Sequence, residues 1–132
     1  AGESNRLEGE SFLANNKKVA GVKVTASGLQ YKVVKAGSGA KPTASSMVEV
    51  HYRGTLINGT EFDSSYSRGQ PATFPVNGVI KGCTEALQLM EEGAKLKLFI
   101  PSELAYGSRG TGADIGPNST LIFDVELLKI KN

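Results

Sequence analysis

Apolar and polar residues alternate along several short stretches of this chain, and that pattern limits its fold more than any other feature. Residues 48–53, 95–100 and 120–131 each place an apolar side chain at about every second position. Successive side chains of a β-strand point to opposite faces, so a period of two predicts strands with one buried face. Antiparallel sheets that are covered on one side have this pattern. The sequence therefore predicts an antiparallel sheet as the main framework.

Turn-forming residues separate these strands and mark further ones. The dipeptide Asn58-Gly59 follows the strand at 48–53, and it tolerates the positive φ angles of a tight hairpin turn. The hairpin would return along residues 61–64. Prolines flank another short extended segment at 72–76, which is typical of edges and bulges. With a first strand at 28–34, we expect five or six strands.

Helical patterns occur in two places. Residues 5–18 suit a helix that begins near Ser4 or Asn5 and ends at a pair of lysines. Residues 84–92 are the only strong helical segment inside the domain, and Gly93 is a natural terminator. The predicted fold is therefore α+β: a curved five- to six-stranded antiparallel sheet wrapped around one short central helix, with an N-terminal helix.

Size and composition favour one globular domain with a short appendage. The chain has 132 residues, of which 39% are hydrophobic. We expect residues 1–26 to form the N-terminal helix and a linker, and residues 27–132 to form the domain. A formal net charge of +2, from 15 basic and 13 acidic residues, offers nucleic acid no strong basic patch. No apolar stretch approaches the roughly 18 residues of a membrane span. We therefore expect the chain neither to bind nucleic acid nor to span a membrane.

Chemically reactive residues are few. Cys83 is the only cysteine and His51 the only histidine, which excludes an internal disulfide and a metal site built from several such ligands. Alternation along the strand turns His51 toward solvent, and an unpaired cysteine is usually a small buried apolar side chain. We therefore predict no metal, no cofactor and no thiol enzyme. The glycine-rich segment 105–119 is predicted to be a long functional loop.

Aromatic and branched side chains lie beside breaks in the strand pattern. Their plain interpretation is hydrophobic core, because aromatic residues are mostly buried. A binding pocket is the alternative, and patterning alone does not separate the two. The residues concerned include Tyr52, Phe62, Phe74, Val79, Ile80, Tyr106 and Phe123.

Several ordered strings of sequence resemble the FKBP family of peptidyl-prolyl cis/trans isomerases, and together they cover about residues 27–130. The strings are Val50-His51-Tyr52-Arg53-Gly54, Gly59-Thr60-Glu61-Phe62-Asp63-Ser64-Ser65, Val79-Ile80-Lys81-Gly82, Ile100-Pro101 with Leu104-Ala105-Tyr106-Gly107, and Leu121-Ile122-Phe123-Asp124-Val125-Glu126-Leu127. The N-terminal helix and the string from Thr84 to Met90 are similar to the bacterial branch that includes the macrophage infectivity potentiator proteins.

The resemblance implies an enzyme that accelerates rotation of the bond before proline by stabilising the twisted amide in an apolar pocket, without covalent chemistry. Its catalytic residues would be Tyr52, Phe62, Asp63, Ile80, Tyr106 and Phe123. Further substrate- or inhibitor-binding residues would be Arg68, Phe74, Val79, Cys83 and Ile115. The implied partners are proline-containing polypeptides and the macrolide inhibitors rapamycin and tacrolimus.

One residue departs from the family pattern. Cys83 directly follows Gly82, where the family usually has the tryptophan that forms the pocket floor. The alternative function is therefore a chaperone-like or partner-binding FKBP module with weak or no turnover.

The resemblance to envelope proteins implies the periplasm or cell envelope, with the cytoplasm as the alternative. Because this branch carries a dimerisation segment on a long helix, the full-length protein is expected to be a homodimer and this chain a monomer.

Overall fold

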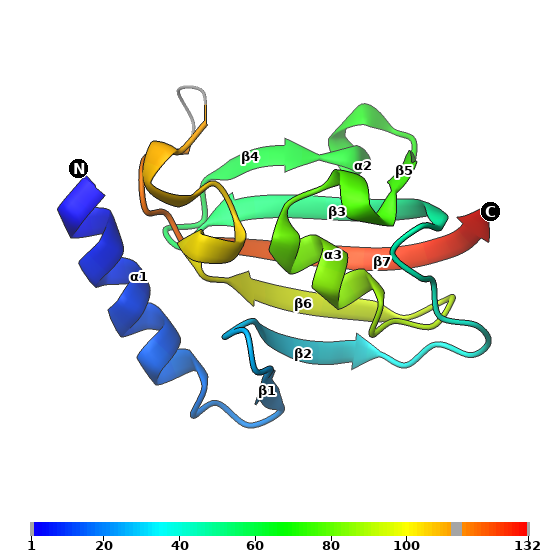
Figure 1. Cartoon of the computed structure of the whole chain (residues 1–132), viewed down its shortest axis with the longest axis horizontal. Coiled ribbons are helices and arrows are strands. Elements are labelled where there is room, and N and C mark those ends of the chain that lie inside the picture. Colours follow the sequence, from blue (N-terminus) through cyan, green and yellow to red (C-terminus); the bar gives the residue numbers. More distant parts are fainter. Residues whose placement is uncertain (1, 112–114, 132) are drawn as a thin grey trace.

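Seven strands form one antiparallel sheet in the computed structural model, which describes residues 2–111 and 115–131 (Figure 1). Their order across the sheet is β1-β2-β6-β7-β3-β4, and β5 also pairs with β3. The strands are β1 (Val22–Val24), β2 (Gln30–Lys35), β3 (Met47–Leu56), β4 (Glu61–Ser64), β5 (Ala72–Pro75), β6 (Lys95–Ile100) and β7 (Leu121–Lys131). The predicted fold class is confirmed, and six strands lie near their predicted positions. The seventh, β1, has only three residues and was not predicted.

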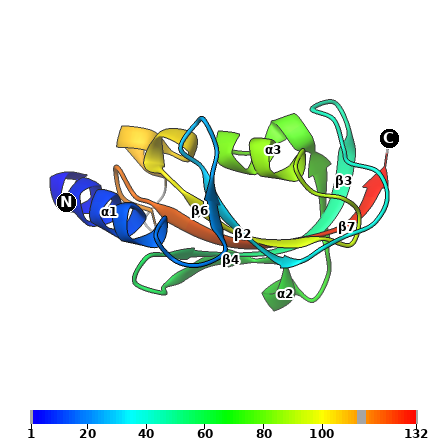
Figure 2. The same ribbon diagram turned by 90° about the horizontal axis from the view of Figure 1, so that it is seen from below.

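The helices lie outside the sheet. They are α1 (Gly2–Asn16), α2 (Ser65–Arg68) and α3 (Lys81–Leu87), with 3-10 turns η1 (Val76–Gly78), η2 (Ser102–Leu104) and η3 (Gly107–Arg109). Figure 2 shows α3 against one face of the sheet and α2 on the opposite side. Of the predicted loop 105–119, residues 112–114 lie outside the described residues.

The bounds predicted for the central helix are wrong at both ends. Ile80 is still extended, with φ −59° and ψ 152°, so the helix begins at Lys81. The Thr84 hydroxyl, at the predicted start, instead donates a hydrogen bond of 2.7 Å to the Val76 carbonyl. At the far end the amides of Leu89 and Met90 bond to carbonyls three residues back, which converts the last predicted turn into a tighter one.

The concave face of the sheet and α3 enclose the core. Alternate residues of β7 are buried there as predicted, and so are Val48, Val50 and Leu98. Ala86 and Leu87 cover them from α3. Such apolar burial stabilises the fold by roughly 25 cal/mol per Å² removed from water.

The N-terminal helix lies against the end of the sheet at the start of β7. Gly9 is its one buried residue, and a Cβ there would collide with the Thr120 Oγ1. Phe12 covers Phe99 at a ring-centroid distance of 6.0 Å. Gln30, a polar residue that alternates with the apolar Leu29 and Tyr31, is only 4% exposed and bonds to this helix. The helix spans Gly2–Asn16 rather than the predicted 5–18.

Candidate functional site

A mostly apolar pocket of about 250 Å³ opens between α3 and the strands β3, β4 and β7. Its walls combine core residues with side chains near the ends of strands and turns. The lining residues are Val50, Tyr52, Phe62, Asp63, Phe74, Gly78, Val79, Ile80, Cys83, Ala86, Leu87, Leu98, Tyr106, Phe123 and Val125. A concave apolar pocket with a few polar groups is the usual form of a small-ligand site.

Nine of the eleven residues expected in the site line this pocket. Arg68 and Ile115 are not among its lining residues. Arg68 instead binds two residues of the rim, while Ile115 is 4% exposed and exchanges backbone hydrogen bonds with Thr111. Core residues such as Val50, Leu98 and Val125 line the pocket as well, although their alternating pattern indicated only a role in packing.

Two aromatic rings form one wall. Phe62 and Phe123 meet edge to face, with ring centroids 5.5 Å apart and planes at 82°. Gly54 lies beside both, and a Cβ there would be 2.6 Å from the Phe62 Cζ and 2.8 Å from the Phe123 Cε1. The wall therefore requires a residue without a side chain at this position of β3.

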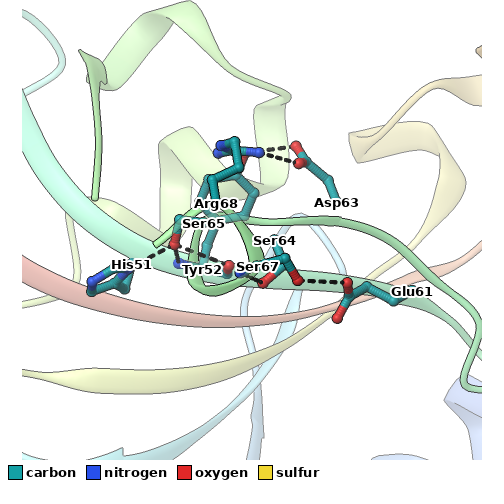
Figure 3. A network of polar contacts seen from close by, with 8 residues as sticks. All are labelled: His51, Tyr52, Glu61, Asp63, Ser64, Ser65, Ser67 and Arg68. Atoms are coloured by element: carbon teal, nitrogen blue, oxygen red, sulfur yellow. Dashed lines mark hydrogen bonds and ion pairs between the residues drawn. The ribbon is translucent and has the colours of Figure 1, made fainter. Parts of the chain in front are cut away.

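Three polar side chains interlock at the rim (Figure 3). The Tyr52 hydroxyl donates to the Asp63 Oδ2 over 2.6 Å, and the Arg68 Nη1 donates to the Asp63 Oδ1 over 2.6 Å. The Arg68 Nη2 also donates to the Tyr52 oxygen over 3.0 Å. Asp63 thus holds both neighbours in place, and each carboxylate oxygen accepts a hydrogen bond from one of them.

The Asp63 carboxyl is held in its charged form. Partial burial acts to raise its pKa, but the hydrogen bonds from Tyr52 and Arg68 and the guanidinium charge outweigh burial, so the pKa is lowered from its ordinary value of 3.8. The pKa of Tyr52 is raised, by burial first and then by the hydrogen bond to Asp63. At neutral pH Asp63 is therefore a fixed anion and Tyr52 a neutral donor.

We expect Asp63→Asn to lower the free energy of unfolding by about 0.5 kcal/mol at neutral pH, because the ion pair with Arg68 is nearly half exposed. The lowered pKa of the folded state makes this stabilisation complete above the unfolded-state value near 4, and it is lost as pH falls through the folded value. Urea unfolding at about pH 7 and about pH 2 measures it. A difference between wild type and variant that persisted in acid would contradict this account.

A second polar cluster lies behind Tyr52 and was missed from the sequence. The Ser65 hydroxyl, fully buried, accepts from the Tyr52 N–H over 2.8 Å and lies 3.3 Å from the Tyr52 carbonyl oxygen. His51 is half-buried rather than solvated: its Nδ1 lies 2.8 Å from the Ser65 Oγ, and its ring stacks on Tyr66 with centroids 4.6 Å apart. The polar segment 65–70 was the only signal, and such a segment is equally typical of a turn.

Cys83 is one of the residues that line the pocket. Its side chain is only partly buried because it faces the cavity, yet its apolar surroundings raise the pKa of the thiol to about 12. A thiol with so high a pKa is almost entirely protonated at neutral pH and is a poor nucleophile. The site therefore offers a small apolar surface at this point rather than a reactive group.

Two of the residues that line the pocket carry hydrogen-bond donors that a ligand could use. Tyr106 lies at its rim and is 39% exposed. Ile80 precedes α3, and within residues 2–111 and 115–131 its N–H has no backbone acceptor. Both could donate to a carbonyl group of a bound ligand.

Across 2–111 and 115–131, no three His, Cys, Asp or Glu side chains come together in a way that could hold a metal ion. In the same ranges no helix has the length and apolar character needed to cross a membrane.

Comparison with known families identifies the class to which this fold and pocket belong. Residues 38–128 match the family described as FKBP-type peptidyl-prolyl cis-trans isomerase, and residues 1–33 match one described as a domain amino terminal to it. The chain belongs to the FKBP-type peptidyl-prolyl isomerase family.

Individual relatives agree with this assignment. FKBP-type peptidyl-prolyl cis-trans isomerase FkpA of Aeromonas hydrophila is 59% identical over 127 residues, which cover 96% of this chain and 47% of that protein. Outer membrane protein MIP of Legionella longbeachae is 54% identical over 129 residues, with 98% and 55% covered. The crystal structure of FkpA from Escherichia coli has a TM-score of 0.95 at 50% identity and covers 98% of this chain and 61% of that one. The chain thus spans about half the length of the curated relatives it matches.

Proposed function

We propose that this chain is a peptidyl-prolyl cis/trans isomerase that binds the proline of a polypeptide in the pocket and accelerates rotation of the bond before it. The observation that carries the proposal is an apolar cavity with a fixed polar rim, lined by residues of the segment 38–128 that matches the family. The names of the relatives, FKBP-type peptidyl-prolyl cis-trans isomerase among them, support the same activity.

The mechanism follows from amide chemistry. Rotation about a prolyl bond is opposed by roughly 18–20 kcal/mol, because the twisted state loses amide resonance. A twisted amide is less dipolar than a planar one, so an apolar environment favours it, and the reaction needs no covalent intermediate. Phe62, Phe123 and Val79 supply that environment. This requires the proline ring to enter the cavity with its amide at the mouth.

Polar groups would orient the substrate rather than react with it. We assign the Ile80 N–H and the Tyr106 hydroxyl as donors to substrate carbonyls. Asp63, held by Tyr52 and Arg68, would polarise the rim. It is not assigned proton transfer, since the reaction moves no proton. Rapamycin and tacrolimus would occupy the same cavity.

A protease-coupled assay on a short Leu-Pro or Phe-Pro peptide tests the proposal. We expect the chain to accelerate cis-to-trans conversion in proportion to its concentration, and we expect rapamycin to suppress the acceleration. The uncatalysed rate, measured with heat-unfolded chain at the same concentration, is the control. If the chain did not accelerate the conversion at any concentration, the proposed isomerase activity would be wrong.

A binding module with little turnover is the second candidate. It is favoured by one observation, the small Cys83 side chain in the lining of the cavity, at the position where the resemblance implies a floor. A shallow contact beneath the proline ring would still allow binding while weakening stabilisation of the twisted amide. Binding of an unlabelled proline peptide without acceleration would identify this function.

We further propose a location in the periplasm or cell envelope. Its support is the relative from Legionella longbeachae, whose name describes it as an outer membrane protein. Cell fractionation followed by immunodetection tests this, and recovery in the cytoplasmic fraction would contradict it.

A further inference from the structure

The N-terminal helix contacts the loop that carries Tyr106. In Figure 1 the gold-to-orange segment after β6 lies beside the N-terminal end of α1. Two side-chain amides join them: the Asn5 Nδ2 donates to the Pro117 carbonyl over 3.0 Å, and the Asn118 Nδ2 donates to the Gly2 carbonyl over 3.2 Å. The helix and residues 117–118 are thus tied in both directions.

The same loop segment is bonded to the pocket rim. The Asn118 N–H donates to the Gly107 carbonyl over 2.8 Å, and Gly107 directly follows the rim residue Tyr106. A continuous path of hydrogen bonds and covalent links therefore runs from α1 through residues 117–118 to the side chain at the mouth of the cavity.

Asn118 has the backbone conformation that this path requires. Its φ of 60° is the only positive value at a non-glycine position among the described residues. Asparagine tolerates this region better than most residues, although glycine adopts it more readily. Asn118 is therefore retained in a mildly unfavourable conformation while its side chain binds α1 and its N–H binds Gly107.

Close contact fixes the helix to the domain. Gly9 touches Thr120 at the start of β7 without room for a Cβ, so α1 cannot shift inward. Gly116 also lies close to Asn5, since a Cβ at Gly116 would be 3.0 Å from the Asn5 Nδ2. Helix and loop therefore meet through small residues at short range.

We propose that Asn5 and Asn118 are positioning residues for the pocket: they use docked α1 to hold the loop so that Tyr106 stays at the mouth. A displacement of α1 would then loosen the pocket rim. By reciprocity, ligand bound at the rim would strengthen docking of α1. This goes beyond the proposed isomerase activity and concerns how residues ahead of the domain influence its site.

The opposite end of the helix provides a matched control. There the Asn16 Nδ2 donates to the Gln30 Oε1 over 2.8 Å, and the Gln30 Nε2 donates to the Leu13 carbonyl. Asn16→Ala removes an amide hydrogen bond between α1 and the domain, as Asn5→Ala does, but at β2 rather than at the loop. Asn118→Gly deletes the bond to Gly2 and keeps the positive φ without strain.

Amide hydrogen exchange followed by NMR on the ligand-free chain tests the path. We expect Asn5→Ala and Asn118→Gly to speed exchange of the amide at position 118 about fivefold, the effect of one lost hydrogen bond, and Asn16→Ala to leave it unchanged. Equal acceleration in all three variants would mean that α1 only adds general stability. No acceleration in Asn5→Ala would mean that the loop holds itself. Either result overturns the proposal.

The effect on the pocket is measured separately by a double-mutant cycle. We expect Asn5→Ala to lower kcat/KM for a Leu-Pro peptide about threefold in the wild-type background and to have no effect when Tyr106 is already alanine. If the effects of the two substitutions on kcat/KM were additive, Asn5 would not act through Tyr106. A wild-type chain without isomerase activity would contradict the proposed function only, because amide exchange needs no turnover.

Discussion

Replacement of Gly54 by valine is expected to lower kcat/KM for prolyl isomerisation more than tenfold and the free energy of unfolding by about 2 kcal/mol. A Cβ at this position would stand 2.6 Å from Phe62 and 2.8 Å from Phe123, well inside ordinary contact between carbon atoms. The added methyl groups must therefore turn one or both rings. Because these rings form a wall of the cavity, a change in their packing also changes the shape of the binding site.

Gly59→Ala separates the two effects. Gly59 has φ of 91° and no atom near its missing Cβ, so alanine there costs about 1 kcal/mol through backbone strain and leaves the pocket untouched. We expect that variant to lose stability but to keep kcat/KM within about twofold of wild type, since it changes no pocket contact. The protease-coupled assay and urea unfolding measure both quantities. An active, stable Gly54→Val variant would show that the aromatic wall is not needed.

Cys83→Trp is expected to raise kcat/KM about fivefold. An indole at the floor would add roughly 40 Å² of apolar contact beneath the proline ring, worth about 1 kcal/mol if it forms fully in the twisted state. That gain corresponds to about fivefold in rate. The prediction assumes that the cavity of about 250 Å³ has room for the larger side chain.

Cys83→Ala is the control, because it removes the thiol and leaves a side chain that is still small. We expect it to stay within about twofold of wild type, because a thiol with a pKa near 12 contributes no charge. Unchanged or lower kcat/KM in a folded Cys83→Trp variant would mean that the floor does not limit turnover. The same peptide assay, with thermal melting as a check on folding, gives both results.

Much of the sheet could be predicted because its inner face is apolar at alternate positions. The strands at 61–64 and 95–100 match the structure at both ends, and Leu121, Phe123 and Leu127 are buried as the pattern indicated. The errors lie where tertiary contacts override local preference. β1 is too short and too exposed to show a period, and Gln30 is buried because it binds the backbone of α1.

The residues of the site followed from family resemblance rather than from periodicity. Patterning could not distinguish a pocket from a core, because the cavity is lined by members of the core itself, such as Val50 and Leu98. It also gave no reason to single out Gly54, whose importance depends on two rings that approach from other strands. The polar contacts of Asp63 required the turn of α2, which brings Arg68 back toward the rim.

Ser65 stabilises the edge of β3 where the chain leaves the sheet after β4, forms α2 and returns as β5. On one side of β3, β4 pairs with residues 53–55 and β5 with residues 47–50, so two residues between them have no strand beside them. The hydroxyl of Ser65 meets the backbone N–H of one of these, Tyr52, and substitutes for the missing strand. An open edge of this kind could otherwise recruit a foreign strand. The buried Ser65 hydroxyl therefore pairs the edge of β3 at Tyr52. The chain can then form α2, which places the Arg68 guanidinium at the mouth of the cavity, without leaving that edge open.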